Sequence, residues 1–444
     1  MMHAVFVEQL VDRAGVRHGV RFESDASGLV TSVTVTGGAQ PGDLVLGTAV
    51  AGFGNAHSHV FHRALRGHTH DEGGTFWTWR ERMYQVAGRL TPDTYRELAA
   101  ATYREMVASG WTAVAEFHYL HHHPDGSRYP GHEMELALVD AAKSAGIRLT
   151  LLDTCYLTGA IGAPLAPEQQ RLGDGSAERW LERWHSLREA LRGRRALVDE
   201  GGHVTLGAAV HSVRAVPPGE LAHIARGYPA NAPLHVHLSE QLAENAASLA
   251  AYGRTPTELL ADEGLLTERL SVVHATHVSA ADIRLLGDAR VHAVICPTAE
   301  ADLGDGIGPA VELTAAGARL AVGSDGHAVI DPLLELRALE AGERLRSLTR
   351  GRIRPTDLLA IGAAGGYAAI GLAEPLSIGG PLDLVELDVE SVRTAGCDPT
   401  QLALAATAAD VQRVVIGGHV AADRTHLAEL GQALASAIAG IEPQ

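Results

Sequence analysis

The feature that most constrains the fold of this chain is a regular alternation of apolar and amphipathic segments through its middle. Apolar runs of strand length are separated by stretches of helical character, such as 92–109 and 331–348. Continuous apolar runs are typical of parallel strands buried on both faces. Eight such runs alternating with helices predict an α/β protein with a (β/α)₈ barrel of the TIM type. The runs are 48–56, 111–117, 147–153, 204–210, 233–238, 270–275, 291–295 and 318–323.

A doubly wound open sheet is the structural alternative to the barrel. The glycines of LGDGIGP, at 303–309, do not stand between a strand and a helix in the spacing of a dinucleotide-binding fingerprint. We therefore interpret this segment as a loop and favour the barrel.

The two ends of the chain differ from the middle in their pattern of apolar and polar residues. Residues 1–50 alternate apolar and polar side chains between turn residues, and similar runs return at 383–388 and 412–423. This pattern is typical of short antiparallel strands. We expect a small β-sandwich domain built from residues 1–50 and 374–444, and a barrel domain over residues 51–373.

Composition excludes several classes of function. The chain has 444 residues with 53 acidic and 36 basic side chains, a net charge of −17, which argues against nucleic acid or an anionic membrane as a partner. No apolar stretch reaches the ~20 residues that span a bilayer, and the N-terminus has no signal-peptide pattern. The three cysteines show no CxxC spacing, which argues against a disulfide framework. We expect a soluble, cytoplasmic protein.

Two histidines end the first predicted strand. Side chains alternate along a strand, so His57 and His59 point to the same side. In a (β/α)₈ barrel the active site lies at the C-terminal ends of the strands, where His237 and Asp325 also fall. Together these residues predict a metal site of three nitrogens and one carboxylate, with a coordination position left open for water.

The number of metal ions follows from the lysine content. Lys143 is the single lysine of the chain and lies in a predicted helix. A lysine-bridged site with two metals is therefore excluded, and we expect one ion per chain. Zn²⁺ suits the predicted ligands, although iron and manganese also accept them.

Polar residues near these ligands predict acid–base catalysis. Glu240 follows His237 by three residues and can move a proton to a leaving nitrogen. His274, at the end of the sixth predicted strand, can hydrogen-bond the attacked centre. Asp325 can accept the proton of the attacking water. This set suits hydrolysis of a C–N bond with loss of ammonia or an amine.

Longer motifs connect the chain to a known family. HSH, the central HVHLSE, a later histidine in VVHATHV, and GSDGH together resemble the mononuclear deaminase branch of the amidohydrolase superfamily. The segments FWTWRERMY, AEFHYLHHHPDG, HSVRAVP and EADLGDGIGPA make it most similar to the formimidoylglutamate deiminase family. These segments span nearly the whole predicted barrel and are far more specific than the histidine pair.

The resemblance implies roles for particular residues. His57, His59, His237 and Asp325 match the zinc ligands of the family, and Glu240, His274 and Asp325 match its catalytic set. The family also implies a homodimer and a substrate with two carboxylates, which arginine binds with paired hydrogen bonds. The positions that match its substrate-binding residues are Arg80, Tyr119, His211 and Arg214.

Two positions depart from the family pattern. His62 stands where the family commonly has glutamine, so we expect it to bind substrate in place of that amide or to shift the substrate preference. Asp302 stands where asparagine is more usual. A further carboxylate near a dianionic substrate would be unfavourable unless it faces away.

The resemblance implies hydrolysis of N-formimino-L-glutamate to N-formyl-L-glutamate and ammonia, in histidine degradation. A second hypothesis keeps the chemistry but takes another amidine, a guanidino compound or a purine as substrate, although a purine pocket would favour aromatic and amide contacts over two arginines. A third hypothesis is a metal-free barrel that serves as a binding or scaffold protein. The complete set of predicted ligands argues against it.

Overall fold

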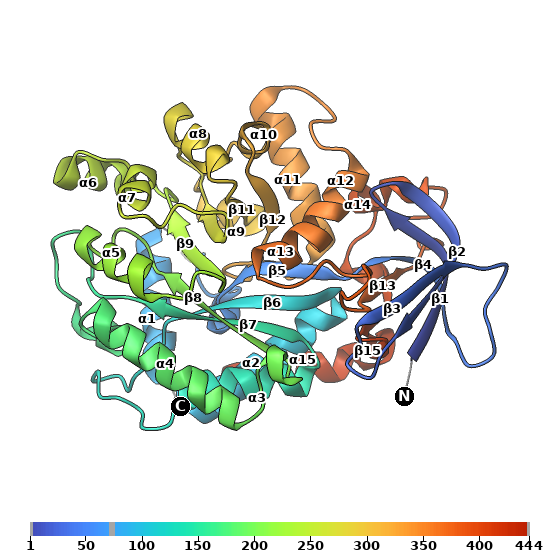
Figure 1. Cartoon of the computed structure of the whole chain (residues 1–444), viewed down its shortest axis with the longest axis horizontal. Helices are drawn as coiled ribbons and strands as arrows, with labels where there is room; N and C mark the ends of the chain where they lie inside the picture. The colour runs from blue at the N-terminus through green and yellow to red at the C-terminus, as the bar shows by residue number, and fades with distance from the viewer. Residues whose placement is uncertain (1–2, 71–75, 442–444) are drawn as a thin grey trace.

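A computed structural model describes residues 3–70 and 76–441 and contains two β-sheets (Figure 1). The larger sheet has eight strands in sequential order, and all neighbouring strands pair in parallel. They are β5 (Phe53–Ser58), β6 (Trp111–His118), β7 (Arg148–Cys155), β8 (Val204–Val210), β9 (Leu234–Leu238), β10 (Leu270–His274), β11 (His292–Ile295) and β12 (Arg319–Val322).

The first and last strands of this sheet meet. Ser58 and Asp325 form a parallel bridge, and the backbone N–H groups of Ser324 and Asp325 donate to the carbonyl oxygen of His57 at 3.1 and 3.0 Å. The sheet therefore closes into a barrel. The predicted (β/α)₈ fold is confirmed, and the doubly wound alternative is wrong.

The first predicted strand, 48–56, is in fact parts of two strands in different sheets. β4 (Leu44–Ala51) belongs to the second sheet, and β5 begins two residues later. The chain changes sheet at Gly52, where a Cβ would lie 2.3 Å from Oγ1 of Thr112 and 2.9 Å from Cβ of Asp383. An uninterrupted apolar run conceals this break, because both strands are buried.

Helices connect the strands and cover the barrel (Figure 1). Within the described residues, no helix is long and apolar enough to cross a bilayer. The helices up to β12 are α1 (Phe76–Arg89), α2 (Pro92–Ala108), α3 (Glu133–Ala145), α4 (Ala177–Gly193), α5 (Pro218–Gly227), α6 (Leu242–Tyr252), α7 (Pro256–Asp262), α8 (Ala280–Asp288), α9 (Pro297–Leu303) and α10 (Ala310–Ala316). Those after it are α11 (Pro332–Ser347), α12 (Pro355–Ala360), α13 (Gly366–Ala369), α14 (Leu402–Ala405) and α15 (Leu427–Ala439). Short helical turns are η1 (Val60–Leu65), η3 (Pro167–Leu172), η4 (Val198–Glu200), η5 (Ile361–Gly365), η6 (Pro399–Gln401), η7 (Ala408–Asp410) and η8 (Arg424–His426).

Local sequence sets where several helices begin. The side chains of Thr91, Ser176, Thr255, Ser279 and Asp331 each accept a hydrogen bond from a backbone N–H in the first turn of the following helix. Such caps satisfy donors that have no partner inside the helix. Proline follows three of these caps, at positions 92, 256 and 332, where its fixed φ favours the first helical turn.

The second sheet combines both ends of the chain, as the sequence predicts. Its order is β15-β14-β13-β4-β1-β2-β3, and its side chains form a small hydrophobic cluster of their own. It differs from the prediction in being one continuous sheet, in which β1 pairs with β4 in parallel. Its other members are β1 (His3–Asp12), β2 (Gly15–Ser24), β3 (Val30–Val35), β13 (Leu384–Leu387), β14 (Val411–Ile416) and β15 (His419–Asp423).

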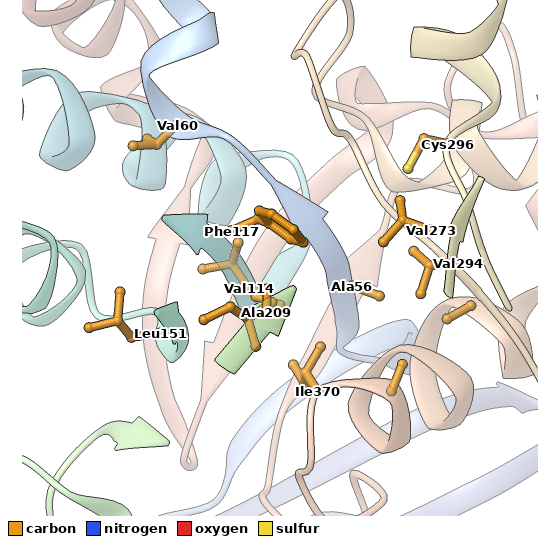
Figure 2. Packing of buried hydrophobic residues seen from close by; sticks show 14 of the residues in the cluster. Ala56, Val60, Val114, Phe117, Leu151, Ala209, Val273, Val294, Cys296 and Ile370 are labelled. Atoms are coloured by element: carbon orange, nitrogen blue, oxygen red, sulfur yellow. The ribbon is translucent and has the colours of Figure 1, made fainter. Parts of the chain in front are cut away.

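Apolar side chains of successive barrel strands are buried in the hydrophobic core. Figure 2 shows Ala56, Val114, Leu151 and Ala209, which come from β5, β6, β7 and β8 and are all fully buried. Burial of apolar surface is the main favourable contribution to folding, at about 25 cal/mol per Å². This core fixes the strand ends on which the polar residues stand.

A buried ionic cluster lies outside the barrel wall, between α4, α3 and β7. The Arg183 guanidinium donates to Asp153 at 2.6 Å, to Asp174 at 2.9 Å and to Glu135 at 3.3 Å. All four side chains are buried. The Trp180 indole N–H also donates to Asp153, at 2.7 Å. Arg183 therefore holds together three carboxylates that burial would otherwise disfavour.

Replacement of Arg183 by Met should lower the free energy of unfolding by about 3–5 kcal/mol, because it leaves buried charges without their partner. Urea unfolding followed by circular dichroism measures this loss. Arg96→Met is the matched control, since Arg96 forms an exposed pair with Asp93 and such pairs contribute at most about 1 kcal/mol. Equal losses in the two variants would contradict a structural role for the cluster.

Candidate active site and metal centre

A cavity of about 450 Å³ opens at the C-terminal ends of the barrel strands. All five predicted substrate-binding residues line it, as do three of the four predicted metal ligands. The lining includes His59, His62, Arg80, Tyr119, His211, Arg214, His237, Glu240, His274 and Asp325. His57 lies directly behind them and is fully buried.

The four predicted metal ligands converge on one point. Nε2 of His237 lies 3.1 Å from Nε2 of His57 and 3.4 Å from Nε2 of His59. Oδ1 of Asp325 lies 3.2 Å from Nε2 of His57 and 3.6 Å from Nε2 of His59. The ring of Phe117 packs against this group, 4.3 Å from the His237 ring.

Backbone carbonyls orient two of the rings. Nδ1–H of His59 donates to the carbonyl oxygen of Phe117, and Nδ1–H of His237 donates to that of His211, each at 2.9 Å. Their Nε2 lone pairs therefore face the common point, as in metal sites where the second ring nitrogen is held by a carbonyl.

Electrostatics keep these rings neutral. Burial, followed by the nearby His57, lowers the pKa of His59 to about 3, and burial also lowers the pKa of His57 and of His237. Unprotonated nitrogens this close repel one another unless a cation lies among them. The donor set thus fits a metal ion such as Zn²⁺.

His274 stands beside this group in a different charge state. Its Nδ1 lies 3.3 Å from Oε1 of Glu300, and its ring stacks 5.6 Å from that of His237. Burial alone would lower the pKa of His274, but the hydrogen bond with Glu300 and the charges of Glu240 and Asp325 outweigh it and raise the pKa to about 10. His274 is therefore a hydrogen-bond donor toward the cavity.

Glu240 is held by an arginine from the preceding loop of the barrel, which follows β8. Nη2 of Arg214 donates to Oε2 of Glu240 at 3.1 Å, and Nε of Arg214 lies 3.9 Å from Oε2 of Glu244. Burial raises the pKa of Glu244, whose Oε1 has no hydrogen-bond partner among the described atoms. The sequence analysis assigned no role to Glu244, although its place one helical turn after Glu240 was a usable signal.

A second layer of polar residues supports the ligands. Glu116 accepts hydrogen bonds from Ser58 Oγ and from the backbone N–H of Val60, each at 2.7 Å. Burial, which those bonds oppose, raises the pKa of Glu116 to about 8. Ser58 lies between His57 and His59, so the Glu116 contact fixes the segment that carries both. The sequence analysis assigned no role to Glu116.

The loop after β12 is held in a similar way. His327 contacts Ser324 at 3.0 Å and Ser58 at 3.2 Å, and Ser324 accepts from the Asn55 amide at 2.7 Å. Asp325 between them has a left-handed φ of 40°. A non-glycine residue in that region is strained by roughly 1–3 kcal/mol, and such strain gathers at functional sites.

His62 lies in the cavity as a partner of Tyr119. Its Nε2 lies 3.1 Å from the Tyr119 hydroxyl, and its ring is 4.7 Å from that of His59. Burial lowers the pKa of His62, so the ring is neutral. At the position where the formimidoylglutamate deiminase family commonly has glutamine, this chain therefore has an imidazole that is hydrogen-bonded to the Tyr119 hydroxyl.

The two arginines reach the cavity from different elements. Arg80, on α1, donates to the Tyr84 hydroxyl from Nη2 at 3.2 Å and lies over the Tyr84 ring. Arg214 follows β8. Burial, then Arg214 and His59, and after them Arg80 lower the pKa of His211, and both arginines line the cavity. Tyr84 and Tyr156 also line the cavity, and the sequence analysis gave neither a role.

Asp302 is not among the residues that line the cavity. Its Oδ1 pairs with Nε2 of His70 at 3.0 Å, and both residues are exposed.

These features are typical of metal-dependent hydrolases with a (β/α)₈ barrel. Comparison with known proteins shows to which family the chain belongs. The model of the amidohydrolase family matches residues 48–421. The chain belongs to the amidohydrolase family, which confirms the resemblance drawn from its motifs.

Individual relatives cover most of the chain. It is 37% identical over 401 residues to formimidoylglutamate deiminase from Pseudomonas aeruginosa, which covers 87% of this chain and 86% of that protein. It is 30% identical over 386 residues to 8-oxoguanine deaminase from the same organism, covering 83% and 80%. A crystal structure of an amidohydrolase from Brucella melitensis has 34% identity and a TM-score of 0.89, and covers 99% of both chains.

Replacement of His59 by Ala should remove one of the converging nitrogens and weaken zinc binding. The loss should exceed the roughly 10–100-fold typical of a residue that only supports a ligand. Equilibrium dialysis with metal analysis by plasma mass spectrometry measures it. His68→Ala, an exposed position on the same segment, should bind zinc like the unchanged protein, and an undiminished affinity in His59→Ala would remove His59 from the ligand set.

Proposed function

We propose that this protein hydrolyses N-formimino-L-glutamate to N-formyl-L-glutamate and ammonia, as a step of histidine degradation, with one zinc ion per chain. The observation that carries the proposal is a cavity lined by two arginines and by three of four converging metal-type ligands, with the fourth, His57, directly behind them. The relative from Pseudomonas aeruginosa that is named formimidoylglutamate deiminase supports the same substrate.

The two arginines account for a substrate with two carboxylates. The chain carries a net charge of −17, so a dianion needs local positive charge to enter. Arg80 and Arg214 supply it from two sides of the cavity, and guanidinium groups bind carboxylates through paired hydrogen bonds. His62, Tyr119 and His211 add polar contacts along the same walls.

His57, His59, His237 and Asp325 would hold the zinc ion. When bound, the ion supplies a water of lowered pKa and polarises the attacked group. Glu240, positioned by Arg214, takes one proton of the water that attacks the formimino carbon and delivers it to the imino nitrogen. Asp325 takes the second proton, from the hydroxyl group added to the carbon, and passes it to the departing ammonia. His274, cationic beside Glu300, donates a hydrogen bond to the developing charge.

A second candidate is a deaminase of the same mechanism that acts on another amidine, a guanidino compound or a purine. The identity to 8-oxoguanine deaminase favours it, and so do the aromatic side chains of Trp79, Tyr84 and Tyr156 in the cavity lining. The two arginines argue for the dicarboxylate instead.

The remaining assignments are part of the same proposal. The domain bounds are 1–50 with 374–444 for the β domain and 51–373 for the barrel. The enzyme works in the cytoplasm as a homodimer. Zinc is proposed over iron and manganese because nitrogen and carboxylate donors in a four-ligand set suit it.

Zinc-loaded protein should release ammonia from N-formimino-L-glutamate far faster than from guanidino or purine compounds. Arg80→Met should raise KM by roughly 10–150-fold, since hydrogen bonds to charged groups contribute about 1.5–3 kcal/mol. A coupled ammonia assay measures both quantities. Arg89→Met, on the same helix but exposed, is the control. Unchanged turnover in Arg80→Met and in Arg214→Met would refute the dicarboxylate pocket.

Glu240→Gln should lower kcat by about 10²–10⁴, the usual contribution of a general acid–base residue, without loss of bound zinc. Stopped-flow kinetics and metal analysis on the same preparation separate the two effects. Near-normal kcat would take Glu240 out of the mechanism, while loss of zinc would show that its effect is indirect.

A further inference from the structure

Two tyrosine hydroxyls in the cavity wall share one buried partner. Tyr84 stands on α1, and Tyr156 directly follows β7. The side-chain amide of Gln169, in η3, donates from Nε2 to the Tyr84 hydroxyl at 2.8 Å and to the Tyr156 hydroxyl at 2.9 Å. Gln169 is only 2% exposed and lies behind the cavity lining. It can therefore act on a bound substrate only through the tyrosines.

The orientation of this amide is set by the backbone. The Ala166 N–H donates to Oε1 of Gln169 at 2.9 Å, so the oxygen must face Ala166 and the nitrogen must face the tyrosines. Gly159 makes room for this arrangement, because a Cβ there would lie 2.6 Å from Oε1. The amide therefore offers the tyrosines donors alone.

The hydroxyl protons then have little choice of direction. Tyr84 oxygen accepts from Gln169 and also from the Arg80 guanidinium, at 3.2 Å, which uses both of its acceptor sites. Gln169 presents only donors, and the Tyr84 oxygen has no acceptor site left, so Tyr156 can donate to neither of them. The Tyr156 proton is therefore left for the cavity that this residue lines.

Tyr156 keeps this proton at neutral pH. Burial, and then Tyr84, raise the pKa of Tyr156, although Arg214 and Arg80 oppose the shift. Both arginines line the same cavity as Tyr156. This wall of the cavity presents a hydroxyl donor beside guanidinium donors.

We infer that Gln169 is a positioning residue that directs the Tyr156 hydroxyl proton into the cavity and so makes this wall select a carboxylate over a carboxamide. The inference rests on the proposed function, because it concerns a side-chain carboxylate of that substrate. A carboxylate only accepts hydrogen bonds and suits a wall of donors. A carboxamide would turn N–H groups toward donors and leave them unpaired, which is how polar sites reject near-isosteric ligands.

Gln169→Glu tests the direction of the protons with almost no change of shape. One carboxylate oxygen can still accept from the Ala166 N–H, but the other can only accept from the tyrosines, which turns their protons away from the cavity. KM for N-formimino-L-glutamate should rise by about tenfold or more, while kcat changes by less than about threefold. The preference in kcat/KM for this substrate over N-formimino-L-glutamine should fall by at least about tenfold.

Gln170→Glu is the matched control, since it adds the same charge at the next, exposed position, where the side chain donates to the Leu165 carbonyl. It should keep both the KM and the preference of the unchanged enzyme. An unchanged preference in Gln169→Glu, or equal losses in the two variants, would overturn the inference.

A double-mutant cycle tests whether the effect passes through Tyr156. Gln169→Leu removes the amide without adding charge and should reduce the preference, as should Tyr156→Phe. In the Tyr156→Phe background, Gln169→Leu should change the preference by less than about twofold, because residues that act as a unit are not additive. Additive losses would show that Gln169 acts by another route.

Equilibrium binding separates this inference from the proposed function. Isothermal titration with N-formyl-L-glutamate and N-formyl-L-glutamine needs no turnover. If the unchanged protein fails to release ammonia from the formimino substrate, the proposed function is wrong. The inference about Gln169 would still be supported if the unchanged protein binds the acid more tightly than the amide and Gln169→Glu abolishes this difference. Equal binding of acid and amide by the unchanged protein would overturn the inference even if the enzyme is active.

Discussion

The closure of the barrel between its first and last strands is the constraint on which the rest of the structure depends. The carbonyl oxygen of His57 accepts from the backbone N–H groups of Ser324 and Asp325, which join segments more than 260 residues apart in sequence. These hydrogen bonds bring the carboxylate of Asp325 beside the two histidines of β5. If the barrel were open at this seam between β5 and β12, Asp325 would stand on the opposite edge of the sheet from His57 and His59.

Much of the polar structure around the seam serves to hold unprotonated nitrogens in place. Backbone carbonyls take the outer N–H of His59 and of His237, and burial disfavours protonation of all three ligand histidines. Glu116 and His327 meet at Ser58, between the two histidines of β5. The support is therefore built into the fold, and the ion would complete a site that the polypeptide has already shaped.

The cavity carries positive side chains although the protein as a whole is negatively charged. The chain is strongly acidic, yet the cavity contains Arg80, Arg214 and a cationic His274. Two of these cations are paired with carboxylates of the chain, Arg214 with Glu240 and His274 with Glu300. The pairing holds Arg214 next to Glu240, the proposed proton donor. Arg80 is held in turn by the Tyr84 hydroxyl, which Gln169 links to Tyr156. Binding and proton transfer thus depend on one connected set of side chains.

Periodic patterns and family motifs were sufficient for the broad fold and for a set of site residues that the structure brings together around one cavity, because strand alternation and strand ends are local properties of a sequence. The (β/α)₈ fold, the shared sheet of the two termini and the family followed from them. The change of sheet at Gly52 did not, since two buried strands in succession look like one apolar run. Only the tertiary structure decided which side chains meet: Glu244 with Arg214, His62 with Tyr119, Asp302 with His70, and Gln169 with two tyrosines. These contacts join residues 13 to 232 positions apart, and their geometry depends on how the barrel closes and how its loops pack, which no local pattern encodes.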